Sequence, residues 1–286
     1  MILTVTPNAA LDVTYTVDTL HNGGSHRVHD VHTRPGGKGI NVADVLTQLG
    51  EPVQATGLAG SQLQVPGFVR TAGESRRTVT VLSTADGTAT IFNEPGPQIS
   101  PGEWDSLVDE FDRLAAHAHV VVLAGSLPPG APVDGYAQLI HRSPAPVILD
   151  TDGDPLRHGI TAGPALIKPN RDELTRLLGR PADIPADCTN LGTPVATTLG
   201  EHGALLTTPD GTWRARPPRT VIGNPTGAGD AFTAALARGL AARTPWPQLL
   251  ADAVALSAAA VCIPVAGAFD PDTYREFAEL VTVEEA

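Results

Sequence analysis

The segment Asn224-Pro-Thr-Gly-Ala-Gly-Asp230 contains the residue types that could most directly do chemistry in this sequence. It leads into an apolar run with helical spacing, Ala231–Ala242, so its small residues are expected at a helix start. There, free backbone N–H groups and the positive end of the helix dipole attract an anion, and glycine lets a ligand approach the backbone. We therefore expect Gly227, Ala228 and Gly229 to form an anion hole.

Asp230 has two interpretations at this position. A carboxylate in the first turn of a helix stabilises the helix dipole, and that role needs no ligand. Alternatively, the carboxylate is a general base aimed at a hydroxyl group next to bound phosphates. The segment alone leaves both interpretations open.

A second glycine-rich segment, Pro35-Gly-Gly-Lys-Gly-Ile-Asn41, also precedes a predicted helix. It is not a Walker A loop, because His32 occupies the place of the first glycine and Gly39 follows the lysine where Ser or Thr is required. Gly227-x-Gly229 is not a dinucleotide fingerprint either, because Phe232 stands at the third glycine position. Two such loops, far apart in the sequence, indicate two ligands that meet.

The charge of the chain makes its few lysines informative. The 286 residues include 31 Asp and Glu against 19 Lys and Arg, for a net charge of −12, and Lys38 and Lys168 are the only lysines. An acidic balance argues against nucleic-acid and membrane-surface partners, since phosphate backbones and anionic headgroups attract basic patches. If the substrate is an anion, a local cluster of cations must bind it.

The remaining composition indicates a cytoplasmic protein. Cys188 and Cys262 are the only cysteines and form no C-x-x-C pair, which argues against a disulfide framework and a thiolate metal site. The N-terminus has no basic region of the kind that begins a secretory signal. The longest apolar stretch, 253–268, is interrupted by Pro264 and falls short of the roughly 20 residues that a membrane span requires.

Strand-like and helix-like segments alternate along most of the chain. The predicted buried strands are Ile2–Val5, Val53–Leu58, Val120–Ala124, Val147–Asp150, Ala165–Lys168 and Val195–Leu199. The predicted helices are Asn41–Leu49, Pro101–Ala118, Val133–His141, Arg171–Leu178, Ala228–Ala242 and Trp246–Val261. This alternation predicts an α/β fold, a single domain over 1–286 with a mostly parallel sheet covered by helices on both faces.

Two stretches in the first third of the chain have the pattern of hairpins instead. Leu11–Val17 and Arg27–Thr33 alternate around Asn22-Gly23-Gly24, and Thr78–Leu82 and Thr88–Phe92 do so around Ala85-Asp86-Gly87. Hairpins are antiparallel, so we expect a small separate sheet, a lid formed by about 11–34 and 76–93. Because a lone sheet exposes its edges, pairing with the lid of a second subunit is expected.

Several residues also have interpretations that involve no ligand. His26, His29 and His32 alternate faces on a strand, which argues against a shared metal and favours the lid surface. Ser126 alone is more typical of a turn than of a ligand, and Glu173 alone of a solvated helix. The two cysteines are expected as small apolar fillers.

Together the two glycine-rich segments resemble the signatures of PfkB-type, ribokinase-like sugar kinases. The resemblance is closest to the branch of 1-phosphofructokinase and tagatose-6-phosphate kinase. Further counterparts follow in order over nearly the whole chain: Thr6–Asp12, Gly73–Arg76, Asn93–Pro97, Gly125–Gly130 and Ile167–Glu173. The resemblance implies a Rossmann-like α/β domain with a β-sheet lid that clasps a second subunit, forming a homodimer.

The resemblance also implies roles for individual residues on the sugar side. Asp230 would be the catalytic base and Gly227–Gly229 the anion hole. Asp12, Gly37 and Asn41 would hold sugar hydroxyls. The contacts to the phosphate already on the substrate would be Lys38, Arg76 and Ser126, with Arg27 reaching across from the partner's lid.

On the nucleotide side the resemblance implies ATP and Mg²⁺ as cofactors. Lys168, Asn170 and Glu173 resemble the stretch that handles ATP phosphates and magnesium, with Glu173 near the metal through water. Thr198, Gly200 and Gly203 would lie along the nucleotide, as would Thr226. These roles suit phosphoryl transfer, which needs positioning and charge neutralisation more than covalent help.

The chain departs from the family pattern at three places. Ser61–Gly67 replaces a glycine-rich turn and a helix, and Pro181–Gly192 replaces a longer helical region. Thr78 stands where the family usually has Asn. These departures bear on which substrate is accepted and, more weakly, on activity.

The expected function is ATP- and magnesium-dependent phosphorylation of a ketohexose monophosphate, with fructose 1-phosphate and tagatose 6-phosphate as the leading candidates. A kinase of a free sugar, nucleoside or cyclitol is the alternative of the same class. A non-catalytic sugar-phosphate-binding relic of a kinase is the alternative of another class. Arg76 and Lys38 favour the phosphorylated substrate, and the intact Asp230 with its glycine loop argues against the relic.

Overall fold

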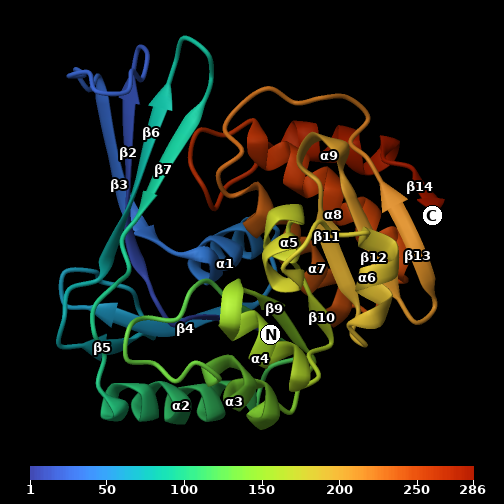
Figure 1. The fold of residues 1–286 in the computed structure, drawn as a ribbon, viewed down its shortest axis with the longest axis horizontal. Coiled ribbons are helices and arrows are strands. Elements are labelled where there is room, and N and C mark those ends of the chain that lie inside the picture. Colours follow the sequence, from blue (N-terminus) through green and yellow to red (C-terminus); the bar gives the residue numbers. More distant parts are fainter.

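The computed structural model describes residues 1–286 and contains a large sheet of ten strands with helices on both faces (Figure 1). The strands run in the order β14-β13-β12-β11-β10-β9-β8-β1-β4-β5. Their bounds are Ile2–Thr6 (β1), Val53–Gly60 (β4), Val69–Thr71 (β5), Val120–Ala124 (β8), Val147–Asp150 (β9), Leu166–Ile167 (β10), Val195–Thr198 (β11), Ala204–Thr208 (β12), Gly211–Ala215 (β13) and Val283–Glu285 (β14).

The sheet is parallel from β5 to β11 and antiparallel from β11 to β14. All six strands predicted from the sequence lie in the parallel part, which confirms the α/β fold. The antiparallel strands β12, β13 and β14 were not among the predicted elements. β13 and β14 are mostly half-buried or exposed, so they carry little of the pattern of a buried strand, whereas β12 is buried and its run Ala204–Thr208 was missed.

Nine helices connect and cover the strands. Their bounds are Lys38–Gln48 (α1), Pro101–Ala115 (α2), Gly135–Arg142 (α3), Gly153–Thr161 (α4), Arg171–Leu178 (α5), Ile184–Asn190 (α6), Ala228–Ala241 (α7), Trp246–Val261 (α8) and Pro271–Leu280 (α9). The six predicted helices are confirmed, with α4, α6 and α9 added. The stretch Ser61–Gly67 contains no helix, and the shortened region 181–192 keeps only α6.

Alternation along each strand divides the core into two layers. In β8, Val120 and Val122 face the cluster that contains α1, α7 and α8, whereas Val121 and Leu123 face the cluster of α2 to α6. All four side chains are fully buried. Burial of each such side chain stabilises the fold by roughly 1.5–3 kcal/mol. The two layers together therefore fix the position of the strand, and with it the start of the loop that follows its carboxyl end.

The lid is a separate sheet of four strands in the order β3-β2-β6-β7, standing away from the large sheet in Figure 1. Its strands are Ala10–Val17 (β2), Asp30–Gly36 (β3), Arg76–Ser83 (β6) and Ala89–Asn93 (β7). The two hairpins are antiparallel, as predicted, and they join through a parallel pair, β2 with β6. The lid thus combines two distant segments into one surface above the carboxyl end of the parallel strands.

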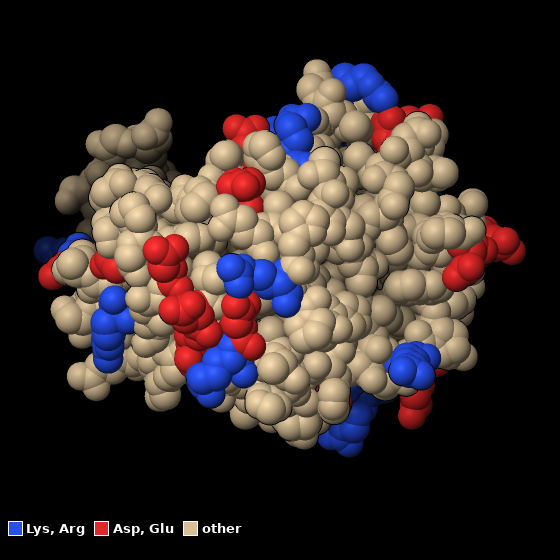
Figure 2. Space-filling model, turned by 90° about the horizontal axis from the view of Figure 1, so that it is seen from below, with Lys and Arg blue, Asp and Glu red and all other residues tan.

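The outer face seen in Figure 2 carries arginines and carboxylates next to each other. On α2 and α3, Arg142 pairs with Asp112 and Arg113 with Glu110, each at 2.6 Å. Such exposed pairs contribute little to stability. None of the helices combines the length and apolar character that a membrane span needs.

Candidate active site

Two adjoining cavities lie where the lid meets the carboxyl ends of the parallel strands. Their volumes are about 870 Å³ and 820 Å³, and both are lined by Lys38, Ile91, Glu173 and Thr226. In an open α/β sheet this edge is where ligands bind, because the loops that follow parallel strands converge there. We call the two the first cavity, bounded by the lid, and the second cavity, bounded by α7 and α8.

The start of α7 has the backbone geometry of an anion site. Gly227 precedes the helix with φ +88°, and a Cβ there would lie 2.7 Å from Ala266 Cα, so only glycine fits. The N–H of Ala228 donates to Pro225 O at 3.2 Å, but those of Gly227 and Gly229 donate to no group of the chain. Two of the three predicted anion-hole amides are therefore free to bind a ligand in the second cavity.

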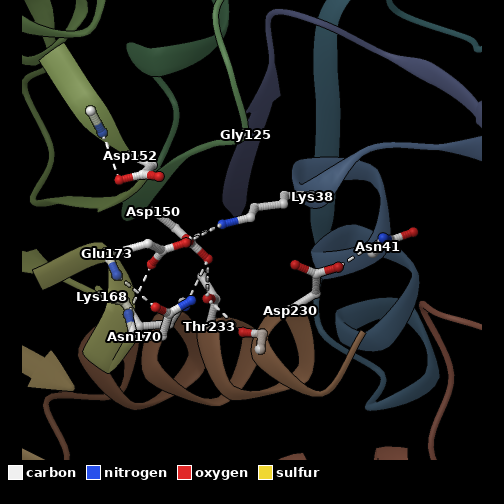
Figure 3. Close-up of polar contacts among 12 residues, drawn as sticks. Lys38, Asn41, Gly125, Asp150, Asp152, Lys168, Asn170, Glu173, Asp230 and Thr233 are labelled. Carbon is white, nitrogen blue, oxygen red and sulfur yellow. Dashed lines mark hydrogen bonds and ion pairs between the residues drawn. The ribbon is translucent and has the colours of Figure 1, made fainter. Parts of the chain in front are cut away.

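Asp230 lies in the first turn of α7 and is 8% exposed. Its Oδ2 accepts a hydrogen bond from Asn41 Nδ2 at 2.7 Å, as Figure 3 shows. Desolvation, reinforced by the negative charge of Asp150, raises the pKa of Asp230 to about 6 against the opposing effect of Lys38, the Asn41 hydrogen bond and Lys168. A carboxylate with this pKa is ionised at neutral pH and is a stronger base than an exposed aspartate.

Both lysines of the chain converge on Asp150, a fully buried carboxylate at the end of β9 (Figure 3). Lys38 Nζ lies 2.7 Å from Oδ1 and Lys168 Nζ 3.3 Å from Oδ2, and Thr233 Oγ1 is 3.0 Å from Oδ2. Burial alone would raise the pKa of Asp150, but the two ammonium groups and these hydrogen bonds hold it below its usual value. The same carboxylates, Asp150 foremost and Glu173, keep Lys38 protonated although desolvation opposes this, so its pKa is raised.

Glu173 has a structural role and also faces the cavities. Its Oε2 accepts from the N–H of Asn170 at 2.8 Å, and Asn170 Oδ1 accepts from the N–H of Glu173 at 2.8 Å, a capping box that starts α5. Its Oε1 lies 3.8 Å from Lys38 Nζ. One oxygen therefore fixes the helix start and the other remains at the junction of the cavities.

The residues predicted for the nucleotide side line one cavity. The wall of the second cavity includes every residue assigned to the nucleotide, the anion hole or the base: Lys168, Asn170, Glu173, Thr198, Gly200, Gly203, Thr226, Gly227, Ala228, Gly229 and Asp230. Asn224 shapes the approach to this loop, because its Oδ1 accepts from Thr226 N–H at 3.0 Å and its Nδ2 donates to Pro264 O at 2.7 Å.

The residues predicted for the sugar side line the first cavity, with one exception. Its wall includes Asp12, Gly37, Lys38, Asn41, Arg76 and Ser126. Arg76 Nε donates to the carbonyl of Asn8 at 3.2 Å, and Asn8 Nδ2 donates to Ser126 Oγ at 3.0 Å. Asn8 thus fixes Arg76 and Ser126, two of the expected phosphate contacts, on one side of the cavity, whereas the third, Lys38, is paired with Asp150 at 2.7 Å.

Arg27 is the exception. It lies exposed in the connection between β2 and β3 at the lid's outer end, and it lines neither cavity within one chain. Its role across a dimer stays a prediction. The neighbouring His29 pairs with Asp18 at 3.1 Å, and the structure contains no cluster of three or more His, Cys, Asp or Glu placed to hold a metal ion.

Three residues at the site were not found from the sequence. Asp150 ends a predicted parallel strand, which was the available signal, since the carboxyl ends of such strands meet at the site. Thr233 lies one turn beyond Asp230, and no pattern marked it. Arg34 stands just before the glycine-rich segment and lines the first cavity.

Comparison with known families agrees with this geometry. Residues 5–272 match the pfkB family of carbohydrate kinases. The match spans most of the 286-residue chain, so the protein belongs to this family. The family membership and the two cavities identify a sugar kinase.

Solved structures are similar over nearly the full length. Phosphofructokinase-2 from Escherichia coli in complex with fructose-6-phosphate is 25% identical, with a TM-score of 0.85 and 98% of each chain covered. A possible 1-phosphofructokinase from Thermotoga maritima is 23% identical, with a TM-score of 0.89 and 100% of this chain and 99% of that chain covered. Ribokinase from Arabidopsis thaliana, complexed with ribose and ATP, is 22% identical, with a TM-score of 0.71 and coverage of 97% and 98%. The last two confirm the ribokinase-like fold.

Proposed function

We propose that this pfkB family kinase transfers the γ-phosphoryl group of ATP to a hydroxyl of a ketohexose monophosphate, with fructose 1-phosphate and tagatose 6-phosphate as the leading substrates. The observation that carries the proposal is the position of Asp230. This buried carboxylate, whose pKa is raised to about 6, lies in the wall of the second cavity. It accepts a hydrogen bond from Asn41, which lines the first cavity. A base so placed can serve a hydroxyl that enters from the lid side.

In the proposed reaction, the sugar hydroxyl oxygen attacks the γ-phosphorus while its proton passes to the carboxylate of Asp230. The bond between the γ-phosphorus and the bridging oxygen breaks, and ADP leaves. The free N–H groups of Gly227 and Gly229 would stabilise the charge on the transferred group. Lys38, which borders both cavities, would neutralise charge at their junction.

The donor set at the junction fits magnesium held mainly by water and phosphate. Glu173 Oε1 makes no hydrogen bond within the chain and lies at the junction, where a hydrated ion could bind it. No cage of three or more acidic or histidine side chains is present, and Mg²⁺ bound with nucleotides commonly uses one or two carboxylates plus phosphates. When bound, the ion would supply charge neutralisation on the ATP phosphates.

The substrate's own phosphate would bind at the end of the first cavity. Arg76 is suited to a forked contact with phosphate oxygens, and Ser126 offers a hydroxyl beside it. Asp12 and Asn41 would bind sugar hydroxyls in the same cavity. A free sugar would leave the Arg76 guanidinium without an anionic ligand, which favours a phosphorylated substrate.

The lid is expected to pair with the lid of a second copy. Three large apolar side chains of the lid that line neither cavity are at least 42% exposed: Val28, Val31 and Phe92. Covering them in a homodimer would bury this surface and could bring Arg27 to the partner's first cavity. The E. coli relative has been solved in a tetrameric inhibited form, so assemblies occur among similar proteins. Sedimentation should give a dimer, and a monomer would remove the proposed role of Arg27.

A substrate screen tests the proposal directly. ATP consumption is measured with Mg²⁺ and a panel of fructose 1-phosphate, tagatose 6-phosphate, fructose 6-phosphate, fructose, tagatose and ribose, with the Asp230→Asn variant as the blank. We expect turnover with a ketohexose phosphate and little with the free sugars. Turnover of free sugars alone would contradict the phosphate assignment, and turnover of none would contradict the proposed reaction.

A further inference from the structure

Arg34 holds together three parts of the molecule that meet beside the base. It belongs to lid strand β3, and its side chain is only 18% exposed. Its Nη1 donates to Asn41 Oδ1 at 2.9 Å and to Ala266 O at 2.7 Å, and its Nη2 forms an ion pair with Asp44 Oδ2 at 2.5 Å. Asp12 Oδ2 lies 3.9 Å from Nη1. The residue thus joins the lid to α1 and to the loop that follows α8.

These contacts determine how the Asn41 amide is turned. A guanidinium group can only donate, so the oxygen of Asn41 must face Arg34. The amide nitrogen then points the other way and donates to Asp230 Oδ2 at 2.7 Å. If the Asn41 amide were reversed, its NH2 group would face the guanidinium N–H groups of Arg34, and its oxygen would face the carboxylate of Asp230. Arg34 therefore selects the one orientation of Asn41 in which the base receives a hydrogen bond.

The second contact of Arg34 reaches the support of the anion hole. The loop at Ala266 packs against Gly227 so closely that a Cβ on Gly227 would lie 2.7 Å from Ala266 Cα. Because Arg34 binds the carbonyl of Ala266, it fixes this loop against the start of α7. Arg34, a residue of the lid, therefore contacts both Asn41, which holds the base Asp230, and the Ala266 loop, which packs against the anion hole.

We propose that Arg34 is a positioning residue that ties the lid to the catalytic base, holding Asp230 through Asn41 in its proton-accepting form and orientation. The proposal rests on the proposed function for the role of Asp230. The other charged groups that face Asp230 are Asp150, Lys38 and Lys168. None of them contacts Arg34, so removal of Arg34 changes the surroundings of the base through Asn41.

The test compares Arg34→Met with Arg34→Lys and a control on the same lid. Arg77→Met removes an exposed cation from β6 whose side chain makes no hydrogen bond or ion pair. With MgATP and fructose 1-phosphate, Arg34→Met should lower kcat about tenfold and move the acid limb of kcat/KM upward by about one pH unit, since a hydrogen bond to the ionised form of the base is lost. The KM for ATP should change less than about twofold, since Arg34 does not line the second cavity.

Two further comparisons separate positioning from a general loss of structure. Arg34→Lys keeps the charge and should recover part of the pH shift, while Arg77→Met should match the unmodified protein. In an Asn41→Ala background, Arg34→Met should cause no further shift of the acid limb, because the residue through which it acts on Asp230 is gone, and any remaining fall in kcat should come from its contact with Ala266. Full additivity of the two substitutions would overturn the inference, as would an unshifted acid limb. If Arg34→Met does not fold, the same double-mutant comparison is made with Arg34→Lys, in the presence and absence of Asn41→Ala.

A measurement without substrate distinguishes failure of this inference from failure of the proposed function. The carboxyl ¹³C resonance of Asp230, assigned by its absence in Asp230→Asn, is titrated in the unmodified protein and in Arg34→Met. We expect the pKa of Asp230 to rise further in the variant. An unchanged titration alongside normal turnover would refute the role of Arg34 and leave the kinase proposal standing. A shifted titration in a protein that phosphorylates no sugar of the panel would refute the kinase proposal instead.

Discussion

The two cavities are built in different ways although they share a wall. The second cavity depends on backbone: free N–H groups at the start of α7, a glycine at φ +88° and the capping box of α5. The first cavity depends on long side chains, chiefly Arg34 and Arg76 of the lid, each held by several partners. Backbone sites follow from local sequence, whereas side-chain sites follow from which distant segments pack together.

This difference predicts different responses to substitution. A backbone site is damaged by adding atoms to glycine and is insensitive to most side-chain changes around it. A side-chain site loses affinity for its own ligand when one cation is removed, and the adjoining cavity keeps its affinity for the other ligand. Asp230, which lines the second cavity and accepts a hydrogen bond from Asn41 of the first, should affect turnover without selecting between the ligands.

Asp230→Asn is expected to have the largest effect. Loss of the base should lower kcat by about 10³-fold or more, because the amide cannot accept the hydroxyl proton. Binding of ATP should stay near normal, since the side chain keeps its size and its hydrogen bond from Asn41. Rapid kinetics and nucleotide titration check both statements. Substantial residual turnover would remove Asp230 as the base.

The glycines at the start of α7 test the backbone character of the second cavity. Gly227→Ala should destabilise the protein by about 1–3 kcal/mol and abolish most activity, because the residue has φ +88° and its new Cβ would contact Ala266. Gly229→Ala is the matched control for folding: its Cβ would lie 3.7 Å from Lys168 Nζ with no closer neighbour. Thermal unfolding should separate the two. Equal stability losses would show that the start of α7 is not limited by backbone geometry.

Arg76→Ala tests the side-chain character of the first cavity. We expect the KM of the sugar phosphate to rise by about 10–100-fold, since a charge-assisted hydrogen bond contributes about 1.5–3 kcal/mol. The KM of ATP should change little, because Arg76 lines only the first cavity. Steady-state kinetics with each substrate varied in turn gives the comparison. Equal effects on both constants would contradict the separation of the two cavities.

The last effect is a change of a few degrees in thermal stability that depends on pH. Because the folded pKa of Asp230 is raised from 3.8 to about 6, its ionisation destabilises the fold by up to about 3 kcal/mol above pH 6. Asp230→Asn should therefore unfold at a temperature a few degrees higher at pH 7–8. The gain should shrink as pH falls from 6 and vanish below about pH 4, where Asp230 is protonated in both states. Calorimetry across pH measures this, and a gain independent of pH would exclude ionisation as its cause.

All the residues predicted for the second cavity line it, whereas Arg27, predicted for the first, lines neither cavity. Asn224–Asp230 and Lys168–Glu173 are continuous segments whose chemistry follows from their own residue order. Asp150 and Thr233 became site residues only because β9 and α7 pack side by side, and no local pattern encodes that contact. Arg34 acquires its role from Asn41, seven positions along, and from Ala266, more than two hundred positions away.

The lid shows the same limit within a single element. Its turns, at Asn22–Gly24 and Ala85–Gly87, mark the hairpins locally. Three of the four predicted strands are confirmed, whereas the strand predicted at Arg27–Thr33 begins only at Asp30 and runs to Gly36. The parallel pairing of β2 with β6 is not local, because about sixty residues separate the two strands and the pairing depends on how the main sheet places them. The sequence pattern therefore predicted two hairpins, and tertiary packing decided how they join.

The convergence of both lysines on Asp150 gives this protein an unusual profile toward amine-directed reagents. Lys168 is 4% exposed, and Lys38 is held protonated by its carboxylate neighbours, so neither is a ready nucleophile in the folded state. Acylating dyes, crosslinkers and amine-coupling surfaces should therefore leave both lysines unmodified in the folded protein, and with them the reaction centre.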